Sequence, residues 1–145
     1  MSAPAMGERW YAARGTGAWH VDREGNRRRI RVSDVADLED AQVIYGSFRE
    51  NVRSGLMPGL ESLVDACWRE RGFGDFWGYA LVAEGAAEVM LETGMHSWDV
   101  AAPLVIIEEA GGRVTDVEGA RGVDTPSFVG SNGLLHDEIL ARLRG

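Results

Sequence analysis

The chain is short of cysteine, of basic residues and of long hydrophobic runs, and each shortage excludes a class of protein. A single cysteine, Cys67, cannot form an internal disulfide, so the composition predicts a reducing, cytoplasmic setting. The longest apolar run, about ten residues around Val100 to Ile107, is far below the roughly 18–20 residues that a membrane helix needs. The sequence shows no signal peptide either.

The charge balance is acidic, with 15 basic against 23 acidic side chains and a formal net charge of −8. Nucleic acids and anionic membranes bind basic surfaces, so we expect neither as a partner. The 145 residues, 45% of them hydrophobic, suffice for a sizeable core. Cys67 lies in an apolar helical pattern and is predicted to be a small core residue.

Residues 1–40 are predicted to form a β-rich unit. The segments 8–13 and 17–21 are typical of a hairpin, and 27–32 of a third strand. Arg27 to Arg29 could bind an anion, but a solvated edge strand whose charges discourage pairing is the favoured interpretation. The acidic connector 33–40 marks the expected boundary with a second unit, residues 41–145.

The second unit alternates strands and helices, which predicts an α/β fold: a layered mixed sheet with helices on both faces. We expect a polar loop at 49–55. Asp75 is expected to cap one helix and Asn132 the last one. Pro103 is tolerated only in a first turn, so its helix should begin close to Asp99. Strands are predicted at 42–47, 71–74, 87–91, 113–115 and 127–130, and helices at 59–70, 76–84, from about 99 and from about 132.

Two carboxylates meet at one junction of this pattern. Glu92 stands where a strand ends, and Asp99 stands in the first turn of the next helix. Such junctions commonly hold ligand or metal sites in α/β proteins. Asp99 could instead only cap its helix and complement the helix dipole, and the local pattern alone favours that simpler role.

Three ordered motifs carry a resemblance to a known family. They are Trp98-Asp99-Val100-Ala101-Ala102 with the later Glu108 to Gly112, then Gly72 to Gly85, and the closing Ser131 to Asp137. Together they resemble the C-terminal half of the inositol monophosphatase superfamily, and the Gly74-Asp75-Phe76-Trp77 run resembles its histidinol-phosphate phosphatase branch.

The resemblance implies a magnesium-dependent phosphomonoesterase acting on a small phosphorylated substrate. It implies that Asp99 is a Mg²⁺ ligand and that Glu92 contacts the hydroxyl or amine side of the substrate. It also implies that Asp75 recognises the amino or imidazole end of histidinol phosphate, since a carboxylate suits a cationic amine.

The family's other motifs, an Asp-Gly-Thr run and a Gly-Glu-Glu-type run, do not occur in this chain. One aspartate cannot hold Mg²⁺ against its hydration shell. We therefore expect a truncated form with weak or no catalysis by itself, and we identify no catalytic residue.

Two alternatives stay open. An inositol phosphatase would use Glu92 on a sugar hydroxyl. A non-catalytic remnant would self-associate, as a homodimer, and the aromatic residues Trp10, Tyr11 and Trp19 favour it. Four other residues are expected to have no catalytic or binding role. They are His96 in a turn, His20 and His136 on the surface or at a cap, and Glu84 at a helix end.

Overall fold

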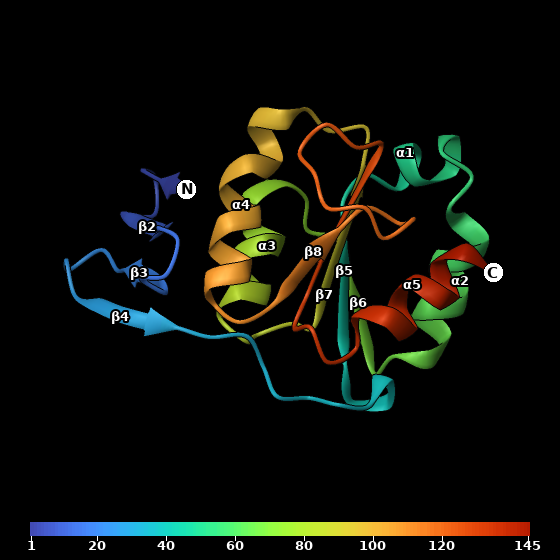
Figure 1. Ribbon diagram of the computed structural model, residues 1–145, viewed down its shortest axis with the longest axis horizontal. Coiled ribbons are helices and arrows are strands. Elements are labelled where there is room, and N and C mark those ends of the chain that lie inside the picture. The colour runs from blue at the N-terminus through green and yellow to red at the C-terminus, as the bar shows by residue number, and fades with distance from the viewer.

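The computed structural model describes residues 1–145, which form two β-sheets separated by a pair of helices (Figure 1). The first sheet is antiparallel, with its four strands in chain order. These strands are β1 (Ser2–Ala3), β2 (Glu8–Ala12), β3 (Ala18–Val21) and β4 (Arg27–Ile30). The predicted hairpin and third strand are confirmed, and Arg27 to Arg29 are exposed on the edge strand as expected.

The second sheet is mixed, with strand order β6-β5-β7-β9-β8. Its strands are β5 (Gln42–Tyr45), β6 (Arg69–Arg71), β7 (Val89–Thr93), β8 (Arg113–Thr115) and β9 (Ser127–Ser131). β6, β5 and β7 are parallel, and β9 runs antiparallel to both of its neighbours. Continuous apolar runs such as Val89 to Leu91 fit this sheet because both of its faces are covered.

Helices cover the two faces of the second sheet, so the predicted layered α/β fold is confirmed (Figure 1). The helices α3 (Asp75–Ala83) and α4 (Ser97–Glu109) lie between the two sheets. On the opposite face lie α2 (Met57–Ala66) and α5 (His136–Arg144). The short helices η1 (Leu38–Asp40) and α1 (Phe48–Arg53) connect elements at the two ends of β5.

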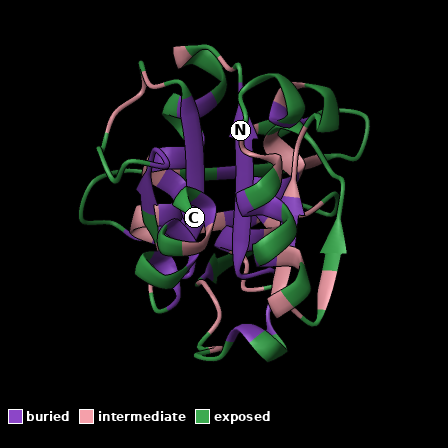
Figure 2. Cartoon of the chain, turned by 90° about the vertical axis from the view of Figure 1, so that its right-hand side faces the viewer, coloured by how far each residue is buried: buried purple, intermediate pink, exposed green.

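Each face of the second sheet has its own hydrophobic core. Figure 2 shows buried residues along the central strands, with exposed residues on the outside of the molecule. The core around α3 and α4 also contains Trp10, Ala18 and Ile30 of the first sheet. Glu84 contributes to this junction, because it accepts a hydrogen bond from the Trp10 indole and pairs with Arg28. Glu84 is the C-cap of α3, at a helix end as expected, but the sequence pattern did not indicate its contacts with the first sheet. The division into units 1–40 and 41–145 stays a prediction.

Four local predictions were wrong. The last helix begins at His136 with Leu135 as its N-cap, so Asn132 does not occupy the cap position. The polar loop at 49–55 is largely helix α1, since Ser47 caps it by accepting from the Glu50 N–H at 3.3 Å. The strand predicted at 71–74 lies two residues earlier, at Arg69–Arg71. Cys67 is the C-cap of α2 and half-buried, and burial raises the pKa of its thiol to about 11.

The histidines also differ from expectation. His136 is fully buried, with Thr115 Oγ1 2.9 Å from Nε2 and Ser131 Oγ 2.7 Å from Nδ1. His20 is 8% exposed, stacks on Trp10 and lies 3.2 Å from a Glu8 carboxylate oxygen. His20 pairs with Trp10 across the hairpin, on the face that packs against the helices. The sequence pattern alone did not indicate this burial. None of the helices has the length and apolar character required to cross a bilayer.

Candidate active site

Asp99 lies in the first turn of α4, and its carboxylate has a local partner. α4 begins at Ser97, and Asp99 Oδ2 accepts a hydrogen bond from the His96 N–H at 3.0 Å. The simpler, capping role considered from the sequence is thus present. The residue nevertheless remains exposed and lines a cleft. Capping through Oδ2 leaves Oδ1 without a hydrogen bond inside the chain.

Pro103 is the seventh residue of α4, so its prediction as a first-turn residue was wrong. A proline has no N–H, and the Asp99 carbonyl therefore lacks the helical donor that position 103 would normally supply. The helix still begins only two residues before Asp99. The positive end of the helix dipole therefore lies at this carboxylate, as expected.

The cleft brings together all three acids that the sequence singled out. Asp75 comes from α3, Glu92 from β7 and Asp99 from α4, and they line a cleft of about 290 Å³. We call it the carboxylate cleft. Its remaining lining residues are Met1, Ser2, Phe76, Tyr79, Trp98, Ala102 and Pro103. The metal-binding role of Asp99 and the substrate-binding roles of Asp75 and Glu92 stay predictions.

Glu92 is the most enclosed of the three acids, with 8% of its surface exposed. Burial raises the pKa of its carboxyl above the ordinary value, and hydrogen bonds from the Asp75 N–H and the Tyr79 hydroxyl oppose this only in part. The Asp75 N–H lies 3.0 Å from Glu92 Oε1. Glycine at position 46 makes room for the side chain, since a Cβ there would overlap Glu92 Cγ and Oε1.

Asp75 has a strained backbone, with φ at 57°, and it is the one non-glycine residue of the chain with positive φ. It was predicted to be the helix cap, but Gly74 occupies that position and Asp75 is the first residue of α3. The strained turn aims the Asp75 N–H at Glu92 Oε1. Strain of this kind, about 1–3 kcal/mol, persists where the surrounding structure enforces it and is frequent at functional sites.

Sequence reasoning missed Tyr79 and Gly46. Tyr79 is buried one helical turn after Asp75, and its hydroxyl lies 3.3 Å from Met95 Sδ. Burial and the neighbouring Glu92 carboxylate raise the pKa of Tyr79 well above its usual value. The four-residue spacing between Asp75 and Tyr79 and the glycine directly after β5 were signals that could have pointed to both.

The three acids are side chains of the type that binds Mg²⁺, but their free oxygens are too few to hold the ion. Carboxylate oxygens are hard ligands that this ion prefers. Glu92 uses one oxygen on the Asp75 N–H, and Asp99 uses one on the His96 N–H. No group of three or more metal-ligating side chains converges in this chain. The donor set that the chain presents is therefore incomplete for a magnesium site.

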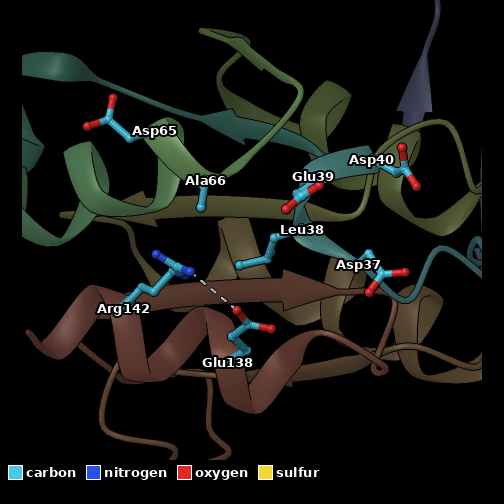
Figure 3. A pocket seen from close by; sticks show the side chains of 8 residues that line it. All are labelled: Asp37, Leu38, Glu39, Asp40, Asp65, Ala66, Glu138 and Arg142. Atoms are coloured by element: carbon cyan, nitrogen blue, oxygen red, sulfur yellow. Dashed lines mark hydrogen bonds and ion pairs between the residues drawn. The ribbon is translucent and has the colours of Figure 1, made fainter.

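A second acidic depression lies on the opposite face of the second sheet (Figure 3). We call it the acidic hollow, and its volume is about 530 Å³. It lies among η1, α2 and α5, where Glu138 and Arg142 approach to 3.5 Å. Its lining residues are Asp37, Leu38, Glu39, Asp40, Asp65, Ala66, Glu138 and Arg142.

The comparisons with known proteins assign the class of protein. The chain matches the inositol monophosphatase family over residues 1–145, and it belongs to that family. It is 44% identical to a histidinol-phosphatase of Mycobacterium tuberculosis over 143 residues, 99% of this chain and 55% of that protein. A histidinol-phosphatase of Streptomyces coelicolor is 39% identical over 99% of this chain and 54% of its own length.

Solved structures agree with the assignment. An IMPase of Thermotoga maritima superposes with a TM-score of 0.83 at 34% identity, covering 98% of this chain and 53% of that one. An inositol monophosphatase of Anabaena gives a TM-score of 0.81 at 29% identity, with 94% and 56% covered. The predicted resemblance, including its histidinol-phosphatase character and its C-terminal half, is confirmed. The chain spans about half the length of the relatives it matches.

Proposed function

We propose that this chain forms part of a magnesium-dependent phosphomonoesterase that acts on histidinol phosphate. The position of Asp75, Glu92 and Asp99 in the lining of one cleft supports this most directly. The relatives named histidinol-phosphatase, at 44% and 39% identity, favour this substrate over inositol phosphate. The single cysteine favours a cytoplasmic location.

The three acids have different roles in this proposal. Asp99 contributes one oxygen ligand to Mg²⁺, which when bound activates water and neutralises phosphate charge. Glu92, buried against the Asp75 N–H, contacts the hydroxyl or amine side of the substrate. The Asp75 carboxylate lies at the exposed mouth of the same cleft and recognises the amino or imidazole end, so the cleft offers two acids to a cationic substrate.

The incomplete donor set predicts weak or no hydrolysis by the chain alone, so the metal role is best tested by binding. Mn²⁺ is a paramagnetic substitute for Mg²⁺ and broadens the NMR signals of nearby amides. We expect broadening at residues 96–99, and its loss in Asp99→Asn. Asp124→Asn, at an exposed position outside the cleft, is the matched control. Broadening that survives Asp99→Asn would exclude Asp99 as the ligand.

The substrate is tested by phosphate release. With Mg²⁺ present, we expect any turnover to be faster with histidinol phosphate than with inositol phosphate, and to be lost in Asp99→Asn. Faster turnover of inositol phosphate would favour the alternative that the chain belongs to an inositol phosphatase.

A second candidate function is self-association without catalysis, as a homodimer. Five large apolar side chains are more than half exposed and would be available to such a contact. They are Phe48, Val52, Trp68, Trp98 and Leu134. A dimer in analytical ultracentrifugation, together with no metal binding at Asp99, would favour this candidate.

A further inference from the structure

Tyr79 of α3 is a buried residue of the carboxylate cleft whose hydroxyl has two possible partners. Its ring packs edge-on against Phe128 of β9, with the ring centroids 5.2 Å apart, and this contact holds the ring in place. The hydroxyl donates to Met95 Sδ at 3.3 Å, and it also lies within hydrogen-bonding reach of the Glu92 carboxylate. A phenol has one proton to donate, so it serves only one of these acceptors at a time.

The two acceptors differ in strength. A thioether sulfur is a weak acceptor, whereas an ionised carboxylate is a strong one. A neutral carboxyl group of Glu92 can instead donate its own proton to the Tyr79 oxygen, which leaves the phenol free to donate to Met95. Burial raises the pKa of Glu92, and the charged groups that face it, Asp75 of α3 and Asp99 of α4, also disfavour its ionisation. The hydroxyl bond to Met95 Sδ therefore corresponds to the neutral form of Glu92.

Met95 belongs to the turn of residues 94–96, which connects β7 to α4. Its half-buried side chain packs against the core around α3 and α4. The next residue, His96, donates its N–H to Asp99 Oδ2 at 3.0 Å and is the N-cap of α4. A hydrogen bond to Met95 Sδ therefore acts on the same turn that holds the Asp99 carboxylate.

We propose that Tyr79 is a positioning residue that couples the charge of Glu92 to the turn before Asp99. Its hydroxyl donates to Met95 Sδ while Glu92 is neutral, and it donates to Glu92 when that carboxylate is ionised. Ionisation therefore releases Met95 and loosens the turn, and a cation that pairs with Glu92 has the same effect because it favours the ionised form. Only this last step rests on the proposed function, in which the cation is the amine of the substrate.

The test measures the pKa of Glu92 from the NMR signal of its carboxyl carbon, in two nearly isosteric variants of the full chain. Tyr79→Phe removes the donor, so the pKa of Glu92 should rise. Met95→Leu removes the competing acceptor, so the hydroxyl serves Glu92 alone and the pKa should fall. Tyr11→Phe, on the first sheet, is the matched control and should leave the pKa of Glu92 unchanged. A general packing effect does not predict opposite shifts from the first two variants.

The methyl group of Met95 gives a second readout. In the wild-type chain its NMR signal should move with pH as Glu92 titrates, and this movement should be lost in Glu92→Gln and in Tyr79→Phe. Shifts of the same sign in the Tyr79 and Met95 variants, or a Met95 signal that does not follow the charge of Glu92, would overturn the proposal.

Addition of histidinol phosphate separates this proposal from the proposed function. We expect the ligand to move the Met95 signal in the same direction as ionisation of Glu92 does. If the two variants shift the pKa as expected but the ligand moves neither signal, the coupling is supported and the proposed substrate site is contradicted. If the ligand moves the Glu92 signal while the variants leave its pKa unchanged, the substrate site is supported and the coupling is overturned.

Discussion

The carboxylate cleft and the acidic hollow are both rich in acids, yet they differ in how those acids are held. In the hollow, Asp37, Glu39, Asp40, Asp65 and Glu138 are all exposed. In the cleft, Glu92 is buried, takes a main-chain hydrogen bond and occupies space left by a glycine. A ligand site needs side chains whose positions are fixed before binding. The number of carboxylates alone therefore does not identify the site.

The largest effect is expected from a substitution beneath the buried acid of the carboxylate cleft. Gly46→Ala puts a Cβ where Glu92 Cγ and Oε1 lie, so the buried side chain must move. We expect a loss of about 3 kcal/mol in the free energy of unfolding, measured by urea denaturation. Gly72→Ala is the control, because its Cβ would meet Tyr45 Cε2 at an ordinary 3.6 Å. Equal effects of the two substitutions would show that Glu92 is not tightly held.

The second-largest effect is expected at low pH from the buried His136, compared with the exposed His96. Burial lowers the pKa of His136 to about 4, from 6.5. The unfolded chain binds this proton more readily, so stability should fall as the pH drops from about 6.5 to 4. We expect a loss of about 2 kcal/mol over that range, and its absence in His136→Gln. His96→Gln, at an exposed position, is the control variant, in which the loss caused by His136 should persist.

The third prediction concerns Glu92 itself. Its raised pKa means that the folded protein binds the proton more readily, so this residue stabilises the fold less as the pH rises through that pKa. Glu92→Gln removes the buried charge and keeps an acceptor for the Asp75 N–H. We expect a gain of about 1 kcal/mol at pH 8 that shrinks toward pH 4, measured by thermal unfolding. A loss of stability at pH 8 would contradict this account.

The smallest expected effect is in the acidic hollow. Glu138→Gln removes the partner of Arg142, a pair at 3.5 Å whose two side chains are 52% and 37% exposed. Surface pairs of this kind contribute little, so unfolding should change by less than about 0.5 kcal/mol. A loss as large as that of Gly46→Ala would mean that the hollow, too, is a fixed structural centre.

The sequence predicted the secondary-structure elements and the positions of the three acids better than it predicted the contacts around individual side chains. Apolar runs and period-2 patterns are local signals, so most of the strands and the helix near Asp99 were predicted correctly. His136 is buried against Thr115 and Ser131, and neither of these residues belongs to its helix. The strained turn at Asp75 depends on Glu92, 17 residues later. Contacts between separate elements of this kind leave no periodic signal in the chain.

The most direct test of the central claim is an NMR titration of the chain with histidinol phosphate and Mg²⁺, which reports binding without requiring turnover. If the carboxylate cleft is the ligand site, the amide signals of Asp75, Tyr79, Glu92 and Asp99 will shift together, and those of Leu38, Asp65 and Glu138 will not. Shifts confined to the acidic hollow, or no shifts at saturating ligand, would contradict the account.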